Sequence, residues 1–352
     1  MATRRGFLAG LASLSLPGLG WADVGSPAWL AAGKEGEDYV LHGLRSDGES
    51  LFSIPLPARG HAAAAHPLRP EAVAFARRPG VFAIVLDCFT GAIRHRLTPP
   101  EGRQFNGHGA FSADGALLMT SEVVAEGSEG RIGIWETETY RRIGEWRTGG
   151  IGPHDMKRLA DGRLIVANGG IQTDPSDRTT LNLDTMRSNL ALLSPSGEIL
   201  EVAELEPDLH QNSLRHLALV GEGVAVALQW QGDLSDPVPL LARWEPGRAI
   251  TLFEAAPEEI YTMKGYAGSI AANQGMIAIS SPRGGAVMVF GEDGTPLATH
   301  RRADICGLAA LEQGFVASDG GGGIWALGGA LDPLRALRHG AASWDNHMVA
   351  IG

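Results

Sequence analysis

Short apolar runs bounded by turn residues recur along the whole chain, and this pattern constrains its fold more than any other feature. Such runs are VFAIVLD (81–87), ALLMTSEV (116–123), RLIVANGG (163–170), GVAVALQW (223–230), MIAISSP (276–282) and GFVASDG (314–320). Asp-Gly pairs, as in SADGA, LADGR and GEDGT, lie between the runs. Asp-Gly between two apolar runs predicts a β-hairpin, because both central residues of a type I′ turn have positive φ. Helical periodicity is almost absent, so we predict an all-β protein.

The hairpins fall into units of similar length. The residues that open the first strand of each unit are His66, His108, His154, His216, Ser269, Gly307 and His347, spaced 38 to 62 residues apart. A period of about 40–50 residues with four short strands per unit is typical of β-propeller blades. The two longest units carry polar insertions with prolines at 169–189 and 231–239. The sequence therefore predicts a seven-bladed β-propeller.

The two ends of the chain complement each other. Only one strand, in HMVAIG (347–352), follows the last opening residue, whereas residues 27–58 supply strands with no opening residue of their own. We expect the C-terminal strand to pair with the N-terminal blade. Such pairing closes the ring and leaves no free sheet edge.

The first 22 residues have the character of an export signal. Arg4 and Arg5 precede the apolar run FLAGLASLSLPGLG, and the small-residue site GWA ends at Ala22. This arrangement predicts a twin-arginine signal peptide over 1–22 and a single periplasmic propeller domain over 23–352. An ordinary secretory signal is the alternative. Because the twin-arginine route carries folded proteins, often with a cofactor in place, it favours a bound metal or prosthetic group.

Charge and hydropathy exclude two classes of partner. The net charge of −11 argues against nucleic-acid binding, which needs a basic face. No stretch of the mature chain approaches the roughly 18 apolar residues of a membrane span. Cys88 and Cys306 could pair in an oxidising periplasm, but their spacing does not decide it, and each is expected to be a small buried side chain.

Several further motifs have plain structural interpretations. Arg77 and Arg78 in ARRPG indicate a solvated hairpin, with contact to an anion or a partner as the alternative. The glycine-rich strings SDGGGG (318–323) and PRGGA (282–286) precede no helix, so we expect strand turns and not phosphate loops. The amides of LQWQGD (228–233) flank a tryptophan that we expect in the core.

Histidines recur at corresponding points of different units. His108, His154, His216 and His347 share this position, His66 adds a fifth, and His61 lies nearby. The first strand of a propeller blade lines the central channel, so these five imidazoles are expected to converge at one channel mouth. Imidazole nitrogens bind transition metals such as iron or copper, and we predict that His66, His108, His154, His216 and His347 are the ligands. Asp155, Asp345, Asn346 and Glu122 are candidate neighbours.

Two other roles fit the same histidines. Each could hydrogen-bond within its own blade and fix a turn, as the Gly-His pair of WD-type blades does. The group could also bind a carboxylate or another anion if the imidazoles were protonated. Short-spaced metal motifs such as HExxH do not occur, so the prediction of a metal depends on register between blades alone.

Several strings together resemble one bacterial family, domain of unknown function 1513 (DUF1513). They include GRQFNGHGAFSADGALLMTSE, GIGPHDMKRLADGRLIVANGGIQTDP, SLRHLALVGEGVAVALQWQGD and WDNHM, and the resemblance runs from about residue 60 to the C-terminus. It implies an exported propeller encoded beside imelysin-type iron-uptake proteins and di-haem oxidoreductase-like proteins, and hence a role in periplasmic iron handling. It implies no catalytic residue. Where the family tends towards Glu-Asn, this chain has Val123 after Glu122.

Three functions remain open on these grounds. The first is a periplasmic propeller that binds iron or copper at its histidines and takes part in iron uptake or handling. The second is a scaffold with no metal or other cofactor, docking to an imelysin-type or di-haem peroxidase-like partner. The third is an enzyme acting on a small exported substrate, for which no specific motif is present.

Overall fold

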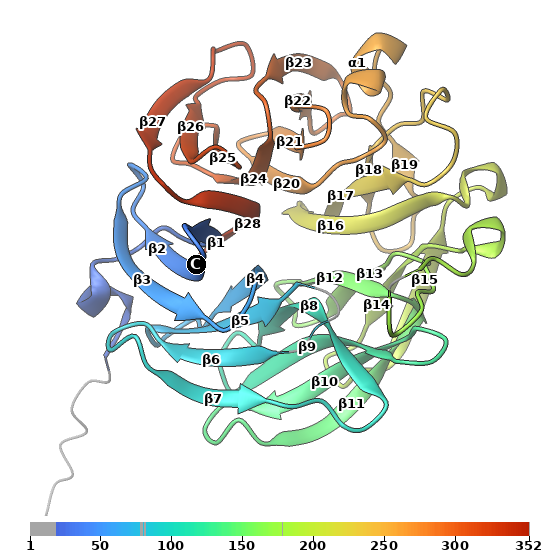
Figure 1. The fold of residues 1–352 in the computed structure, drawn as a ribbon. Coiled ribbons are helices and arrows are strands. Elements are labelled where there is room, and N and C mark those ends of the chain that lie inside the picture. The colour runs from blue at the N-terminus through green and yellow to red at the C-terminus, as the bar shows by residue number, and fades with distance from the viewer. Residues whose placement is uncertain (1–18, 78–79, 81, 178, 352) are drawn as a thin grey trace, which may run out of the picture.

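Seven four-stranded antiparallel sheets surround a central axis in the computed structural model, which describes residues 19–77, 80, 82–177 and 179–351 (Figure 1). The predictions of an all-β protein and of a seven-bladed propeller are confirmed. Within each sheet the strands follow one another from the axis outward.

The first blade joins the two ends of the chain. From the axis outward it contains β28 (Ser343–Ala350), β1 (Trp29–Glu35), β2 (Asp38–Leu44) and β3 (Ser50–Leu56). Trp29 pairs with Ala350 in an antiparallel ladder. The predicted closure of the ring by the C-terminal strand is therefore confirmed.

The other six blades use consecutive strands. The second and third contain β4 (Gly60–Ala65), β5 (Glu71–Ala76), β6 (Ala83–Asp87), β7 (Ile93–Leu97), β8 (Arg103–Phe111), β9 (Leu117–Val124), β10 (Glu129–Glu136) and β11 (Arg142–Ile151). The fourth and fifth contain β12 (Pro153–Arg158), β13 (Leu164–Asn168), β14 (Asn189–Leu193), β15 (Ile199–Glu204), β16 (Asn212–Val220), β17 (Gly223–Trp230), β18 (Leu241–Trp244) and β19 (Thr251–Leu252). The sixth and seventh contain β20 (Ser269–Asn273), β21 (Met276–Ser281), β22 (Ala286–Gly291), β23 (Pro296–Arg301), β24 (Ile305–Ala310), β25 (Phe315–Asp319), β26 (Gly323–Leu327) and β27 (Arg335–His339).

Helical structure is limited to short turns among the described residues. These are the 3-10 turns η1 (Trp21–Val24), η2 (Leu183–Thr185) and η3 (Pro207–Leu209), and the helix α1 (Pro257–Thr262). None of the described helices is long and apolar enough to cross a membrane.

The middle strands are buried on both faces. All six residues of β5 and all five of β13 are buried, because each blade packs between two neighbours. This explains why those strands are continuous apolar runs and do not alternate with polar residues. The outermost strand β15 is instead mostly exposed, as an edge in contact with water should be.

The prediction that His66 opens the first strand of its blade is wrong. The inner strand β4 begins at Gly60, so His61 lies within it, whereas His66 follows its last residue. The run HAAAAH (61–66) has a histidine at each end, and the four alanines between them do not show which histidine opens the strand. The insertions lie where expected: 169–189 connects β13 to β14, and 231–239 lies between β17 and β18.

The two cysteines are free and buried, as the sequence indicates. Arg4 and Arg5, on which the export signal rests, lie outside the described residues. Of the predicted signal peptide the structure describes 19–22, where the Trp21 indole donates a 2.8 Å hydrogen bond to the His66 carbonyl. Cleavage after Ala22 and twin-arginine export stay predictions.

Candidate metal centre

Each histidine-bearing inner strand is irregular at its histidine. The register of β4 with β5 shifts between Gly60 and Ala63, and that of β8 with β9 between Phe105 and Gly109. Corresponding shifts occur in β12, in β16 and in β28, where three residues that include His347 stand opposite Ala32 of β1. A β-bulge interrupts the alternation of side chains and re-aims one of them, and such bulges are common next to functional sites. The bulges therefore account for the way several blades direct an imidazole towards the axis.

Five histidines on five blades lie ring against ring at the axis. Going round the channel they are His61, His108, His154, His216 and His347, and we call them the histidine collar. Centroids of successive rings are 4.5 to 5.0 Å apart, including the pair that closes the circle. The two remaining inner strands, β20 and β24, contribute no histidine.

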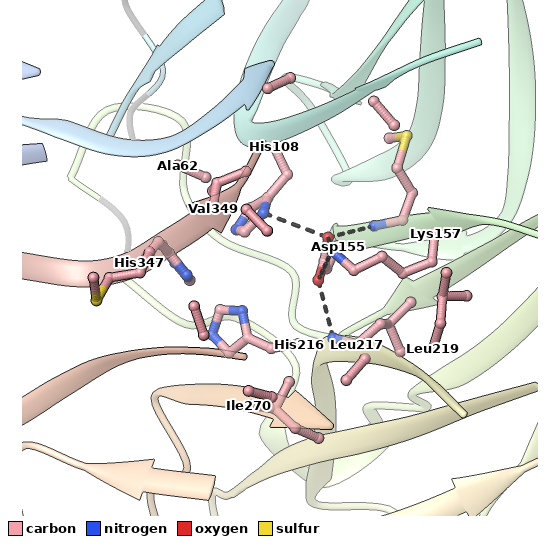
Figure 2. Close-up of a pocket in the computed structure, with 18 of the residues that line it drawn as sticks. Ala62, His108, Asp155, Lys157, His216, Leu217, Leu219, Ile270, His347 and Val349 are labelled. Atoms are coloured by element: carbon pink, nitrogen blue, oxygen red, sulfur yellow. Dashed lines mark hydrogen bonds and ion pairs between the residues drawn. The ribbon is translucent and has the colours of Figure 1, made fainter. Parts of the chain in front are cut away.

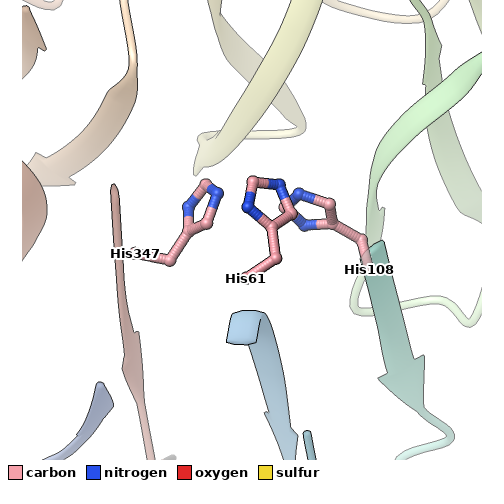
Figure 3. Close-up of side chains that lie close together, drawn as sticks. All are labelled: His61, His108 and His347. Atoms are coloured by element: carbon pink, nitrogen blue, oxygen red, sulfur yellow. The ribbon is translucent and has the colours of Figure 1, made fainter. Parts of the chain in front are cut away.

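Two groups within the collar have the arrangement of a metal site. Ligand nitrogens of His61, His108 and His347 lie within 4.8 Å of one another (Figure 3), and so do those of His108, His154 and His216. Two nitrogens bound tetrahedrally to one ion at about 2.0–2.1 Å are about 3.3 Å apart. The nitrogens of a triad would therefore have to approach one another by up to about 1.5 Å when an ion binds. His108 belongs to both groups.

Burial favours the neutral form of three collar imidazoles, those of His61, His216 and His347. Desolvation, followed by repulsion from the neighbouring imidazoles, lowers the pKa of both His61 and His216 well below the usual value for histidine. The pKa of His347 is lowered to about 4, again chiefly by burial, although Asp345 and Asp155 act in the opposite direction. Neutral imidazole offers a lone pair to a metal but no positive charge to an anion. The collar itself is therefore suited to a cation.

A buried carboxylate supports one collar member from behind. Asp155 Oδ1 lies 3.6 Å from His108 Nδ1, and Asp155 Oδ2 accepts a 2.9 Å hydrogen bond from the backbone N–H of Leu217 (Figure 2). Burial raises the pKa of Asp155, but Lys157, His108 and backbone N–H donors outweigh this and lower it overall. The ionised carboxylate therefore places negative charge beside the collar, as is usual behind metal-bound histidines.

A second buried carboxylate precedes His347 by two residues. Asp345 accepts a 2.6 Å hydrogen bond from Arg59 Nε and lies 3.5 Å from Arg77 Nη1. The Asp345 side chain is 5% exposed. Two predicted neighbours remain. Asn346 Nδ2 donates a 3.2 Å hydrogen bond to Tyr266 Oη, and Glu122 contacts Thr120 and Arg142 of its own blade.

The collar has a cavity on each side. One, of about 460 Å³, is lined by the residues that follow each collar histidine along its strand, many of them alanines, and we call it the alanine chamber (Figure 2). The other, of about 280 Å³, is lined by Arg77, Arg215, Arg283 and polar side chains, and we call it the arginine chamber. His216 lines both chambers, so the collar separates the two halves of the channel.

Of the predicted ligands, the structure brings together His108, His154, His216 and His347 but not His66. Both ring nitrogens of His66 are engaged away from the collar: Nδ1 accepts hydrogen bonds from the backbone N–H groups of Leu68 and Arg69 in its own turn, and Nε2 lies 3.2 Å from the carbonyl of Gly115 on the next blade. His66 thus has the turn-fixing role that was the alternative for the whole series.

His61 occupies the place expected for His66. The His61 ring also explains why the string FNGHG has a glycine, Gly107, which faces it across the blade interface. Gly107 has a φ of +94°, and a Cβ there would lie 2.6 Å from the His61 ring. The arginine chamber was not predicted, because its three arginines lie on three different blades and share no motif.

Comparison with known proteins identifies a family and a fold. No sequence among the curated proteins matches this chain significantly. Among solved structures, a chain of hydrazine synthase from Kuenenia stuttgartiensis is 11% identical, with a TM-score of 0.62, over 96% of this chain and 100% of that chain. U3-55K (16% identical, TM-score 0.57, 80% of this chain and 81% of that chain) and the RRP9 WD40 repeats (16%, 0.57, 80% of each chain) are also similar.

At these identities the likenesses show the fold alone. The family assignment comes from the sequence, which matches the family described as protein of unknown function (DUF1513) over residues 54–351. The match covers the inner strands that carry all five collar histidines. The chain therefore belongs to the DUF1513 family.

Proposed function

We propose that this protein binds a transition-metal ion, copper or iron, in the histidine collar and takes part in the handling or uptake of iron in the periplasm. The observation that carries the proposal is the convergence of five buried imidazoles from five blades, with two triads whose ligand nitrogens lie within 4.8 Å. Three imidazole nitrogens from three strands are sufficient protein ligands for an ion that keeps an open position.

Unpaired ring nitrogens favour this role over a purely structural one. A histidine that fixes its own turn uses a ring nitrogen there, as His66 does with Nδ1. In contrast, Nδ1 of His61, Nδ1 of His216 and Nε2 of His347 are buried with no hydrogen-bond partner in the described part of the chain. Leaving a buried polar atom unpaired costs about 1–3 kcal/mol. A metal ion would use these lone pairs.

The donor set narrows the choice of metal. The collar offers imidazole only, and among the described residues neither Cys88 nor Cys306 belongs to either candidate ligand group. Imidazole suits copper, zinc and ferrous iron, and affinity at nitrogen sites is highest for copper. Ferric iron would need oxygen ligands from elsewhere.

The periplasmic setting and the partners form the second part of the proposal. They rest on Arg4 and Arg5 in the leader and on the family resemblance to exported propellers encoded beside imelysin-type and di-haem oxidoreductase-like proteins. A metal site inside a pre-folded propeller is consistent with export after folding.

The metal content of the protein tests the proposal. The chain is produced with its own leader, without an affinity tag, and purified from the periplasmic fraction in three forms: wild type, His108→Ala and His339→Ala. His339 is an exposed imidazole on the outer strand β27 and serves as the matched control. We expect about one ion per chain in the wild type and control and almost none in His108→Ala, which belongs to both triads.

Far-UV circular dichroism and urea unfolding of each form show whether His108→Ala is folded. His347→Ala, which removes a ligand from only one triad, is the second variant. Metal content far below one ion per chain, unaffected by either collar variant, would contradict the proposal. If such a protein still co-purified with an imelysin-type partner, the metal-free scaffold would be the better account.

A further inference from the structure

The arginine chamber has the chemistry of an anion site. Its lining includes three collar histidines and three arginines, namely His61, His154, His216, Arg77, Arg215 and Arg283. Three carry guanidinium groups, and no Asp or Glu is among the described residues that line it. The whole chain has a net charge of −11, so this local excess of positive charge runs against the composition.

The guanidinium groups come from separate parts of the ring. Arg215 lies in the bulge of β16 next to His216 and is 5% exposed. Arg283 lies in the turn between β21 and β22, with its guanidinium carbon 4.2 Å from the centre of the Tyr266 ring. Arg77 follows β5 and shares Asp345 with Arg59. Guanidinium groups recognise carboxylates through pairs of parallel hydrogen bonds.

The chamber adjoins the collar directly. His61, His154 and His216 line it, and Nδ1 of both His61 and His216 lacks a hydrogen-bond partner in the described residues. An ion held by a collar triad would keep at least one coordination position open. Oxygen atoms of a ligand in the chamber could fill that position while the arginines neutralise the rest of its charge.

We infer that the arginine chamber binds a small polycarboxylate that completes the coordination of the metal in the collar, so that the protein takes up a metal–carboxylate chelate. The inference rests on the proposed metal site. The volume of about 280 Å³ lies near the lower end of small-ligand pockets. Thr173, Thr180 and Gln231 supply further polar contacts at the wall. Carboxylate oxygens would also supply the donors that ferric iron lacks in the collar.

Calorimetric titration of the metal-free protein with citrate, at fixed ionic strength, tests the chamber by itself. We expect citrate to bind, and acetate to bind far more weakly because it engages one arginine instead of several. Arg283→Gln should weaken citrate binding about tenfold or more. Arg147→Gln removes the same charge from the outer strand β11, where Arg147 is 74% exposed, and should have no effect.

Two further variants distinguish citrate binding in the arginine chamber from metal binding in the collar. His108→Ala should lose metal but keep citrate binding in the metal-free form. Arg283→Lys keeps the positive charge but loses the planar fork of donors, so it should weaken citrate binding without removing metal. Copper should tighten citrate binding in the wild type and not in His108→Ala. If metal binds normally but citrate binds no better than acetate, the inference is overturned and the metal site stands. If the wild type binds copper but its affinity for citrate does not change, the inference that citrate joins the metal as a chelate is also overturned. If citrate binds but no metal does, both the chelate and the proposed function fail.

Discussion

Acid should destabilise the metal-free protein through the collar. The pKa of His347 is about 4 in the folded protein, chiefly because of burial, against 6.5 for an ordinary histidine. Between these two values the unfolded chain takes up a proton on this imidazole and the folded chain does not. The free energy of unfolding therefore falls as the pH falls from 6.5 to 4, and the stability is complete only above pH 6.5.

The size of this effect follows from the two pKa values. At pH 5, where most carboxylates are still ionised, His347 alone should lower the free energy of unfolding by about 2 kcal/mol relative to pH 7.5. His61 and His216 act in the same direction, because burial and mutual repulsion also lower their pKa. About 2 kcal/mol is a large share of the 5–15 kcal/mol typical of a folded domain.

Urea unfolding in EDTA at pH 7.5 and pH 5 measures the effect. His347→Leu keeps an apolar group of similar size in the collar and removes the titrating ring, so its loss of stability on acidification should be smaller by about 2 kcal/mol. His339→Leu, changed at an exposed position of β27, should behave as the wild type does. Equal acid losses in the wild type and His347→Leu would refute the account of a neutral, desolvated collar.

Three other changes have defined outcomes. Gly107→Ala should cost about 1–3 kcal/mol in urea unfolding, because the position has φ +94° and the added Cβ meets a collar ring at 2.6 Å; wild-type stability would be contrary to this. Asp155→Asn should weaken metal binding about 10–100-fold in a competition assay with a chelator, since the carboxylate beside His108 supports that ligand; unchanged affinity would show that it does not. Replacing both Arg4 and Arg5 by Lys should leave the protein in the cytoplasmic fraction on immunoblots, and undiminished export would point to an ordinary secretory signal.

The fold could be predicted because its information is local. Short, largely apolar middle strands, several of them next to Asp-Gly turns, mark the blades, and seven such units of similar length leave few alternatives. The closure by β28 could be predicted because the C-terminus supplies one strand with no blade of its own and the N-terminus supplies a blade that lacks its inner strand. Register along the inner strands then placed His108, His154, His216 and His347 together.

Other parts of the site could not be predicted, for physical reasons. Four alanines between His61 and His66 leave the start of β4 undefined in the sequence. The bulges at the collar break the alternation by which one face of a strand is recognised. The arginine chamber combines Arg77, Arg215 and Arg283 from three blades, and only the closed ring brings them together. In the sequence each is one arginine beside a turn or strand.

The location of a bound metal would show whether the histidine collar is the binding site. Crystals of the protein loaded with copper, measured at the copper absorption edge, would give the position of the ion from its anomalous scattering. The account predicts a single strong peak on the propeller axis, within about 2.0–2.1 Å of an imidazole nitrogen of His108 and of two other collar histidines. A peak at surface side chains with the collar free of metal would contradict it.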